Sequence, residues 1–94
     1  MLKQTQPKRE DGGAIALKLM AFLAADSDQL GRFMALSGLS PADLRANLPD
    51  PAFQGGVLDF ALSDESLLLA FAANEGLDPA AIMRARASLP GFAQ

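Results

Sequence analysis

Apolar residues recur along most of the chain at the spacing of an α-helix. Between residues 13 and 24, and again between 50 and 62, they fall at i, i+4, i+7 and i+8, on one face of a helix. These positions are Ile15, Leu19, Phe22 and Leu23, followed by Phe53, Val57, Phe60 and Ala61. No segment alternates apolar and polar residues with a period of two, and β-branched residues are few, so we expect no β-sheet.

Helix boundaries are marked by short polar residues, prolines and glycines. Asp or Ser accepts hydrogen bonds from the first helical turn, Pro is tolerated at the first position, and Gly adopts the left-handed conformation that ends a helix. The expected N-caps are Asp26 (with Gln29 completing a capping box), Ser40, Asp50, Ser63 or Asp64, and Asp78; the expected stops include Gly38 and Gly76. We therefore predict an all-α, compact bundle of five to six short helices, at about 13–24, 27–37, 41–47, 51–62, 65–75 and 79–88.

The chain matches itself when it is shifted by 38 residues. Gly-Leu-Ser-Pro-Ala at 38–42 then coincides with Gly-Leu-Asp-Pro-Ala at 76–80. Further coincident pairs are Phe22 with Phe60, Asp26 with Asp64, Leu30 with Leu68, Phe33 with Phe71, and Ala35 with Ala73. One interpretation is two pseudo-repeated three-helix halves, about 13–49 and 50–94. The other is shared capping residues within an irregular six-helix fold, and the sequence leaves both open.

The predicted helix at 65–75 has an apolar run without a polar face. Residues 67–73 read Leu-Leu-Leu-Ala-Phe-Ala-Ala. A helix that is apolar all round is usually buried, so we expect this one to be the central helix of the bundle. The alternative is that one edge, at Leu69 and Ala73, lies in a dimer or partner interface.

Composition narrows the possible functions. The 94 residues include no Cys, His, Tyr or Trp, so thiolate and imidazole ligands and the commonest general base are absent. We therefore expect no enzyme activity, no metal and no cofactor, and we find no small-molecule signature. Residues 1–12 are polar and contain Pro7, which predicts a disordered tail before a single helical domain at 13–94.

The charge balance is acidic. The net charge is −3, and from residue 13 onward nine acidic residues face five basic ones. Because phosphate neutralisation supplies most of the affinity for nucleic acids, we expect nucleic acid to be an unlikely partner. The longest apolar run, at 14–25, is interrupted by Lys18 and is too short to cross a bilayer. With no export signal, the expected location is cytoplasmic.

Two local patterns suggest chemistry, and each has a simpler interpretation. Asp64 and Glu65 are adjacent acids, but both fit the first turn of a helix, where the backbone dipole favours negative charge. Ala72, Gly76 and Ile82 have the spacing of a DNA-binding helix-turn-helix, with Arg84 and Arg86 on the second helix. That turn pattern has low specificity, because helices also pack in this way without DNA.

Four arginines could contact a protein partner: Arg32, Arg45, Arg84 and Arg86. Solvated ion pairs with nearby acids are the alternative. Together with Leu69 and Ala73, these arginines are the candidate partner contacts, and we expect the partner to be another protein or a second copy of the chain.

Several segments carry a resemblance to a known family. They are residues 30–39, then Asp43-Leu44-Arg45, then Val57-Leu58-Asp59-Phe60, then the Leu67–Phe71 run. In this order they resemble a family of short alphaproteobacterial proteins, domain of unknown function 3572, over about Ala14 to Leu89. The resemblance implies a compact helical cytoplasmic protein and brings no activity or functional residues with it. The sequence therefore favours a small non-catalytic protein-interaction or adaptor module able to self-associate; the alternative is a helix-turn-helix-like nucleic-acid-binding regulator.

Overall fold

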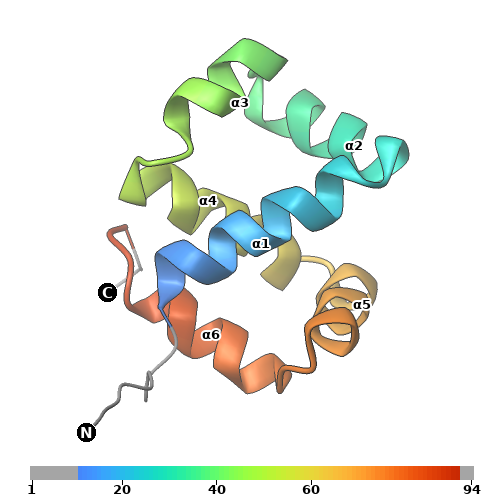
Figure 1. The fold of residues 1–94 in the computed structure, drawn as a ribbon, viewed down its shortest axis with the longest axis vertical. Coiled ribbons are helices and arrows are strands. Elements are labelled where there is room, and N and C mark those ends of the chain that lie inside the picture. The colour runs from blue at the N-terminus through green and yellow to red at the C-terminus, as the bar shows by residue number, and fades with distance from the viewer. Residues whose placement is uncertain (1–10, 92–94) are drawn as a thin grey trace, which may run out of the picture.

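Capping residues set the N-terminal boundary of every helix in the computed structural model, which describes residues 11–91. Over this range the chain forms six helices and no strand, which confirms the predicted all-α bundle. They are α1 (Gly12–Ala24), α2 (Ser27–Ser37), α3 (Pro41–Asn47), α4 (Pro51–Leu62), α5 (Glu65–Glu75) and α6 (Pro79–Ala87). Figure 1 shows α2 and α3 at one end of the long axis, α5 and α6 at the other, and α1 and α4 between them.

The predicted caps accept hydrogen bonds from the first helical turns. The confirmed N-caps are Asp26, Ser40, Asp50, Asp64 and Asp78, each through its side-chain oxygen, and Asp11 is a further N-cap that was not predicted. Gly38 and Gly76 end α2 and α5 with φ of 74° and 68°, the left-handed region that glycine enters without strain. One detail differs: the Gln29 side chain accepts a hydrogen bond from Arg32 at 2.6 Å, and the reciprocal capping box lies at Ser40 and Asp43 instead.

The N-terminal boundary of the helical region also differs from the prediction. Asp11 is the N-cap of α1 and Gly12 is its first residue, so the tail predicted at 1–12 ends earlier. Gly12 is buried because α1 begins against the end of α6: a Cβ there would lie 2.5 Å from the carbonyl oxygen of Ala85. The rest of the predicted tail, residues 1–10, lies outside the described residues.

Helices α1 and α4 form the centre of the bundle. They pack closely on each other, α1 also contacts α2 and α6, and α4 also contacts α5 and α6. The largest fully buried side chains are Leu19 and Leu23 of α1, Val57 and Leu58 of α4, Phe71 of α5 and Ile82 of α6. Phe22 and Phe71 meet edge to face at 5.5 Å between ring centroids, which links α1 to α5.

The prediction that the fifth helix is central is wrong. Leu67, Phe71 and Ala72 are buried, but Leu69 is 48% exposed and Ala73 also faces solvent. The apolar run misled the prediction because alanines occupy much of it, and an exposed alanine leaves little apolar surface in water. Burial of α5 is therefore confined to one side, toward α4 and α6.

The 38-residue shift relates helix boundaries but not helix packing. Helices α2 and α5, and likewise α3 and α6, begin 38 residues apart. Helix α6 packs on α1, α4 and α5, whereas α3 makes only sparse contacts with its neighbours. Asp43 and Asn47 of α3 stand where α6 has the buried Ala81 and Ala85, so α3 lacks the small apolar positions that bring α6 close. A duplication stays a prediction.

No helix in the described part of the chain has the length and apolar character needed to span a bilayer.

We expect Phe71→Ala to lower the free energy of unfolding by about 3–4 kcal/mol, because it removes a fully buried aromatic side chain and leaves a cavity. Leu69→Ala, two residues away on the exposed side of α5, should change it by less than about 1 kcal/mol. Urea denaturation followed by circular dichroism at 222 nm measures both. Equal losses would contradict the one-sided burial of α5.

Asp43 is expected to titrate below the ordinary pKa of 3.8, because hydrogen bonds from the backbone N–H and the side chain of Ser40 lower its pKa. A lowered pKa means that the charged Asp43 supports α3 above pH 3.8, and that this support is lost as the pH falls through the lowered value. An NMR titration of the Asp43 carboxyl carbon measures this, and Ser40→Ala should move the pKa upward. An unshifted pKa in the wild-type protein would exclude the capping box in solution.

Candidate functional site

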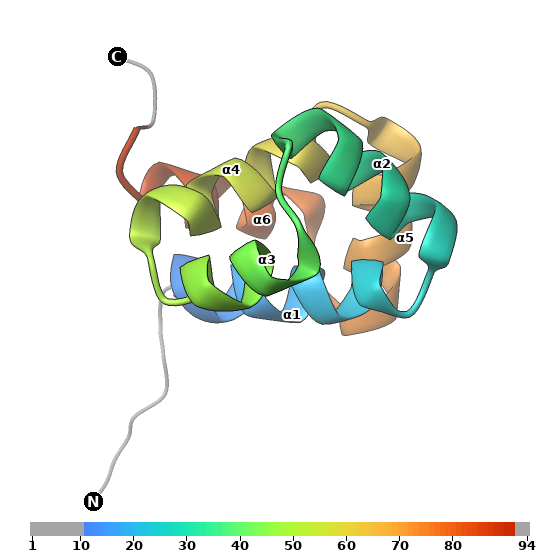
Figure 2. The same cartoon turned by 90° about the horizontal axis from the view of Figure 1, so that it is seen from above.

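An open apolar groove of about 460 Å³ lies between α2 and α4. We call it the α2–α4 groove; it is lined by Phe33, Leu36 and Ser37 of α2, by Leu39 after α2, and by Phe53, Gly56, Asp59, Phe60 and Ser63 around α4. Figure 2 shows α2 and α4 on the same side of the molecule, away from α1. Little backbone contact joins α2 to α4, so side chains form both the floor and the walls.

Three phenylalanines hold the walls of the α2–α4 groove together. Phe33 meets Phe60 at 5.2 Å and Phe53 at 6.1 Å between ring centroids, both edge to face. Edge-to-face pairs add about 0.5–1.5 kcal/mol beyond their buried area. Leu36 on the rim is 74% exposed, more than any other large apolar residue that the structure describes as exposed. The groove thus combines a fixed aromatic base with an apolar rim open to solvent.

The hydroxyl groups at the α2–α4 groove are engaged within the chain. The Ser37 hydroxyl donates to the carbonyl of Met34 at 3.3 Å and accepts from the N–H of Leu39 at 3.3 Å. The Ser63 hydroxyl donates to the carbonyl of Phe60 at 2.8 Å. These bonds occupy the protons that the two serines would otherwise donate to a ligand.

Asp59 is the charged residue that lines the α2–α4 groove, and its carboxylate holds Arg86. Arg86 Nε donates to Asp59 Oδ1 at 2.6 Å and Nη2 donates to Oδ2 at 3.1 Å, a bidentate pair. The Arg86 side chain is 6% exposed and that of Asp59 is 57% exposed. The pair therefore joins a buried cation on α6 to a carboxylate at the protein surface.

Arg86 also fastens the chain after α6. Its Nη1 donates to the carbonyls of Leu89 at 3.3 Å and Pro90 at 3.1 Å. Gly55 makes room for this arrangement, because a Cβ there would lie 2.8 Å from Nη1. The prediction of Arg86 as a surface contact for a partner is therefore wrong: the side chain is an internal clasp among α4, α6 and the C-terminal turn.

A second apolar groove, of about 500 Å³, lies between α1, α2 and α3. We call it the α1–α3 groove; it is lined by Leu17, Met20, Ala21 and Ala24 of α1, Leu30 and Met34 of α2, and Pro41, Leu44, Arg45 and Leu48 around α3. Arg45 is thus placed on an apolar surface, as a partner contact would be.

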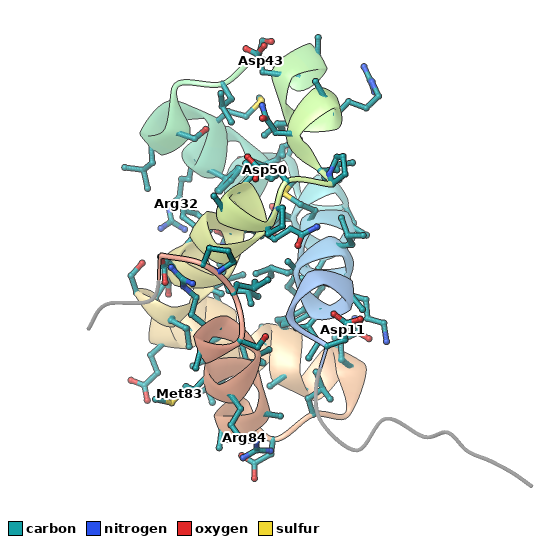
Figure 3. All side chains as sticks on the ribbon, turned by 90° about the vertical axis from the view of Figure 1, so that its left-hand side faces the viewer. Asp11, Arg32, Asp43, Asp50, Met83 and Arg84 are labelled. Atoms are coloured by element: carbon teal, nitrogen blue, oxygen red, sulfur yellow. The ribbon has the colours of Figure 1, made fainter. Side chains whose placement is uncertain are left out.

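The remaining candidate residues lie apart from one another. Arg32 on α2 pairs with Asp64 at 3.2 Å and lies over the Phe60 ring at 5.1 Å, so it borders the α2–α4 groove as an ion pair. Arg84 lies at the end of the molecule opposite Asp43, beside Met83, far from Arg32 (Figure 3). Leu69 and Ala73 are exposed on α5. The structure therefore does not gather the six predicted contacts into one surface.

The acidic residues singled out in the sequence have structural positions. Asp64 is the N-cap of α5, accepting from the N–H of Leu67 at 3.2 Å, and Glu65 lies in its first turn. Within residues 11–91, no cluster of three or more Asp and Glu side chains could hold a metal ion.

Sequence reasoning missed the α2–α4 groove, although Gly56 in the middle of an apolar helix was a signal for it.

A family model described as protein of unknown function (DUF3572) matches residues 9–92. No curated protein and no solved structure matches the chain.

The Arg86–Asp59 pair predicts an asymmetric response to mutation. Asp59→Asn leaves a buried guanidinium without its counter-charge and should lower the free energy of unfolding by about 3 kcal/mol. Arg86→Met keeps the buried volume filled and leaves a solvated carboxylate, but it also removes the hydrogen bonds to the carbonyls of Leu89 and Pro90, so the loss should be about 2 kcal/mol. Arg32→Met, at a pair whose arginine is half exposed, should stay below about 1 kcal/mol. Urea denaturation of the three variants tests this order, and a larger loss for Arg86→Met than for Asp59→Asn would refute it.

Proposed function

The chain belongs to the family of proteins of unknown function DUF3572, and we propose that it is a small non-catalytic protein-interaction or adaptor module that docks its partner in the α2–α4 groove. The observation that carries the proposal is Leu36, a large apolar side chain left 74% exposed on the rim of an apolar groove. Contiguous apolar surface that is rimmed by polar residues is typical of protein-interaction sites.

Composition supports the same proposal. A chain without cysteine is suited to the reducing cytoplasm of a bacterial cell, where we place the protein. Its remaining side chains can recognise a partner by apolar contact and by charge. Self-association is the simplest form of such recognition, because a second copy presents the same apolar rim.

A helix-turn-helix-like regulator remains the alternative proposal, and it has less support. Of the two arginines expected on its recognition helix, Arg86 is buried against Asp59. Residues 11–91 hold ten acidic and five basic residues, a balance that repels phosphate.

We expect Leu36→Glu to abolish partner binding or self-association while leaving the fold intact, because the side chain is mostly in water and its replacement changes stability by only about 0.5 kcal/mol. Light scattering after size-exclusion chromatography over a range of concentrations, together with affinity capture from the native cells, measures both. Met83→Glu is the matched control, since Met83 is 58% exposed and lies outside both grooves. A wild-type protein that stays monomeric and captures nothing would disprove the proposal.

A further inference from the structure

Gly56 occupies a position in α4 where the fold does not require a glycine. A Cβ at this residue would meet no atom within 4 Å, whereas a Cβ at Gly12 or Gly55 would collide with α6 or with Arg86. Glycine inside a helix is less stable than alanine by about 0.5–1 kcal/mol. Gly56 lines the α2–α4 groove, so the effect of this glycine is to keep the groove deep.

The walls of the α2–α4 groove have the form of a helix-binding site. On α4 the lining residues are Phe53, Gly56, Asp59 and Phe60, spaced i, i+3, i+6 and i+7 along one face, and Ser63 continues this row at the C-cap. This stripe is about 15 Å long at 1.5 Å per residue, which is nearly three turns of an opposing helix. Two helices with an apolar floor between them are the usual receptor for the apolar face of a third.

The polar groups at the α2–α4 groove disfavour a small-molecule ligand. Small-molecule sites orient their ligands with a few convergent polar groups. Here the two serine hydroxyls donate to backbone carbonyls, so among the described lining residues Asp59 is the one charged residue left to contact a ligand. The groove therefore presents mainly apolar surface, which is complementary to a row of apolar side chains.

The charge of the groove and of the protein distinguishes among partners that present an apolar face. Asp59 is the charged residue that lines the groove, and its side chain is 57% exposed. Arg86 takes one hydrogen bond at each carboxylate oxygen, which leaves further lone pairs open to a second donor. Arg32 pairs with Asp64 at 3.2 Å just as Asp59 pairs with Arg86, but in the Asp59 pair the guanidinium is buried and the carboxylate is the member exposed to a partner. With ten acidic against five basic residues in 11–91, a cationic partner is attracted and an anionic one repelled.

We infer that the α2–α4 groove receives an amphipathic helix of a partner protein, with a bulky apolar residue over Gly56 and a Lys or Arg reaching Asp59. The inference rests on the proposed function and adds the class of partner to it. The groove is fully formed within residues 11–91, so the partner needs only to bring a helix with an apolar row and a positive charge.

The test is a selection from a displayed library of helical peptides of about 16 residues, carried out on the full-length wild-type protein. We expect enriched peptides to place apolar residues at i, i+3, i+4 and i+7 and to carry a Lys or Arg beside that row. Gly56→Leu fills the groove and should weaken their binding about tenfold or more, the effect of losing a central anchor. Replacing the peptide's Lys or Arg by Gln should weaken binding severalfold and reduce its dependence on salt.

Gly31→Leu is the matched control. Gly31 is also an exposed glycine within a helix, a Cβ there would also meet no atom within 4 Å, and it lines neither groove. Its substitution should leave peptide affinity unchanged. All protein variants keep Asp59, so the clasp of Arg86 stays intact.

The outcomes separate this inference from the proposed function. Enriched peptides that bind Gly56→Leu as well as wild type, or that carry acidic residues, would overturn the inference and leave an interaction module with another surface. No enrichment, combined with self-association that Leu36→Glu abolishes, would make a second copy the occupant and also overturn the inference. No enrichment, no self-association and no captured partner would end both proposals.

Discussion

Short helices cannot persist alone in water, and this constraint governs the whole molecule. The six described helices span 7 to 13 residues, at or below the length at which even favourable isolated helices are marginal. Each must therefore bury an apolar face against another. Helices α1 and α4 provide the central apolar contact of the bundle, because their residues Leu19, Leu23 and Val57 are removed from water completely. The other helices are stable to the extent that they contact this pair.

The helices outside the central pair contact it to different extents. Function is proposed from the apolar surface that stays exposed where those contacts are few. Helix α6 brings Ala81, Ile82 and Ala85 into the core and is locked further by Arg86. Helix α3 places one residue, Leu44, in the core, and its capping box holds it locally. One apolar groove remains between α2 and α4, and a second remains between α1, α2 and α3.

The helix boundaries could be predicted from the sequence because they are decided by local physics. An Asp or Ser that accepts from the next turn, a Pro at the first position and a Gly at the end all act within about four residues. The apolar faces of α1 and α4 followed from periodicity for the same reason. The central helices of the bundle could not be predicted in this way. An apolar run such as Leu67–Ala73 indicates that a helix has apolar surface, but it does not indicate which neighbouring helices cover that surface. Arg86 failed as a surface prediction because its partner Asp59 is 27 residues away, and pairing at that distance depends on packing that local patterns do not contain.

The fold requires glycine at some positions and only tolerates it at others. Gly38 and Gly76 have left-handed backbones, and Gly12 and Gly55 permit close approach by α6 and Arg86, so stability alone accounts for them. Gly56, like Gly31, has neither reason and as a helix residue lowers stability, but of these two only Gly56 lines an apolar groove. A local choice that opposes the fold, at a position that deepens an apolar groove, is where sequences most often depart from the best folding solution in favour of function. Under the proposed function, stability favours alanine at residue 56 of α4, whereas binding in the α2–α4 groove favours glycine.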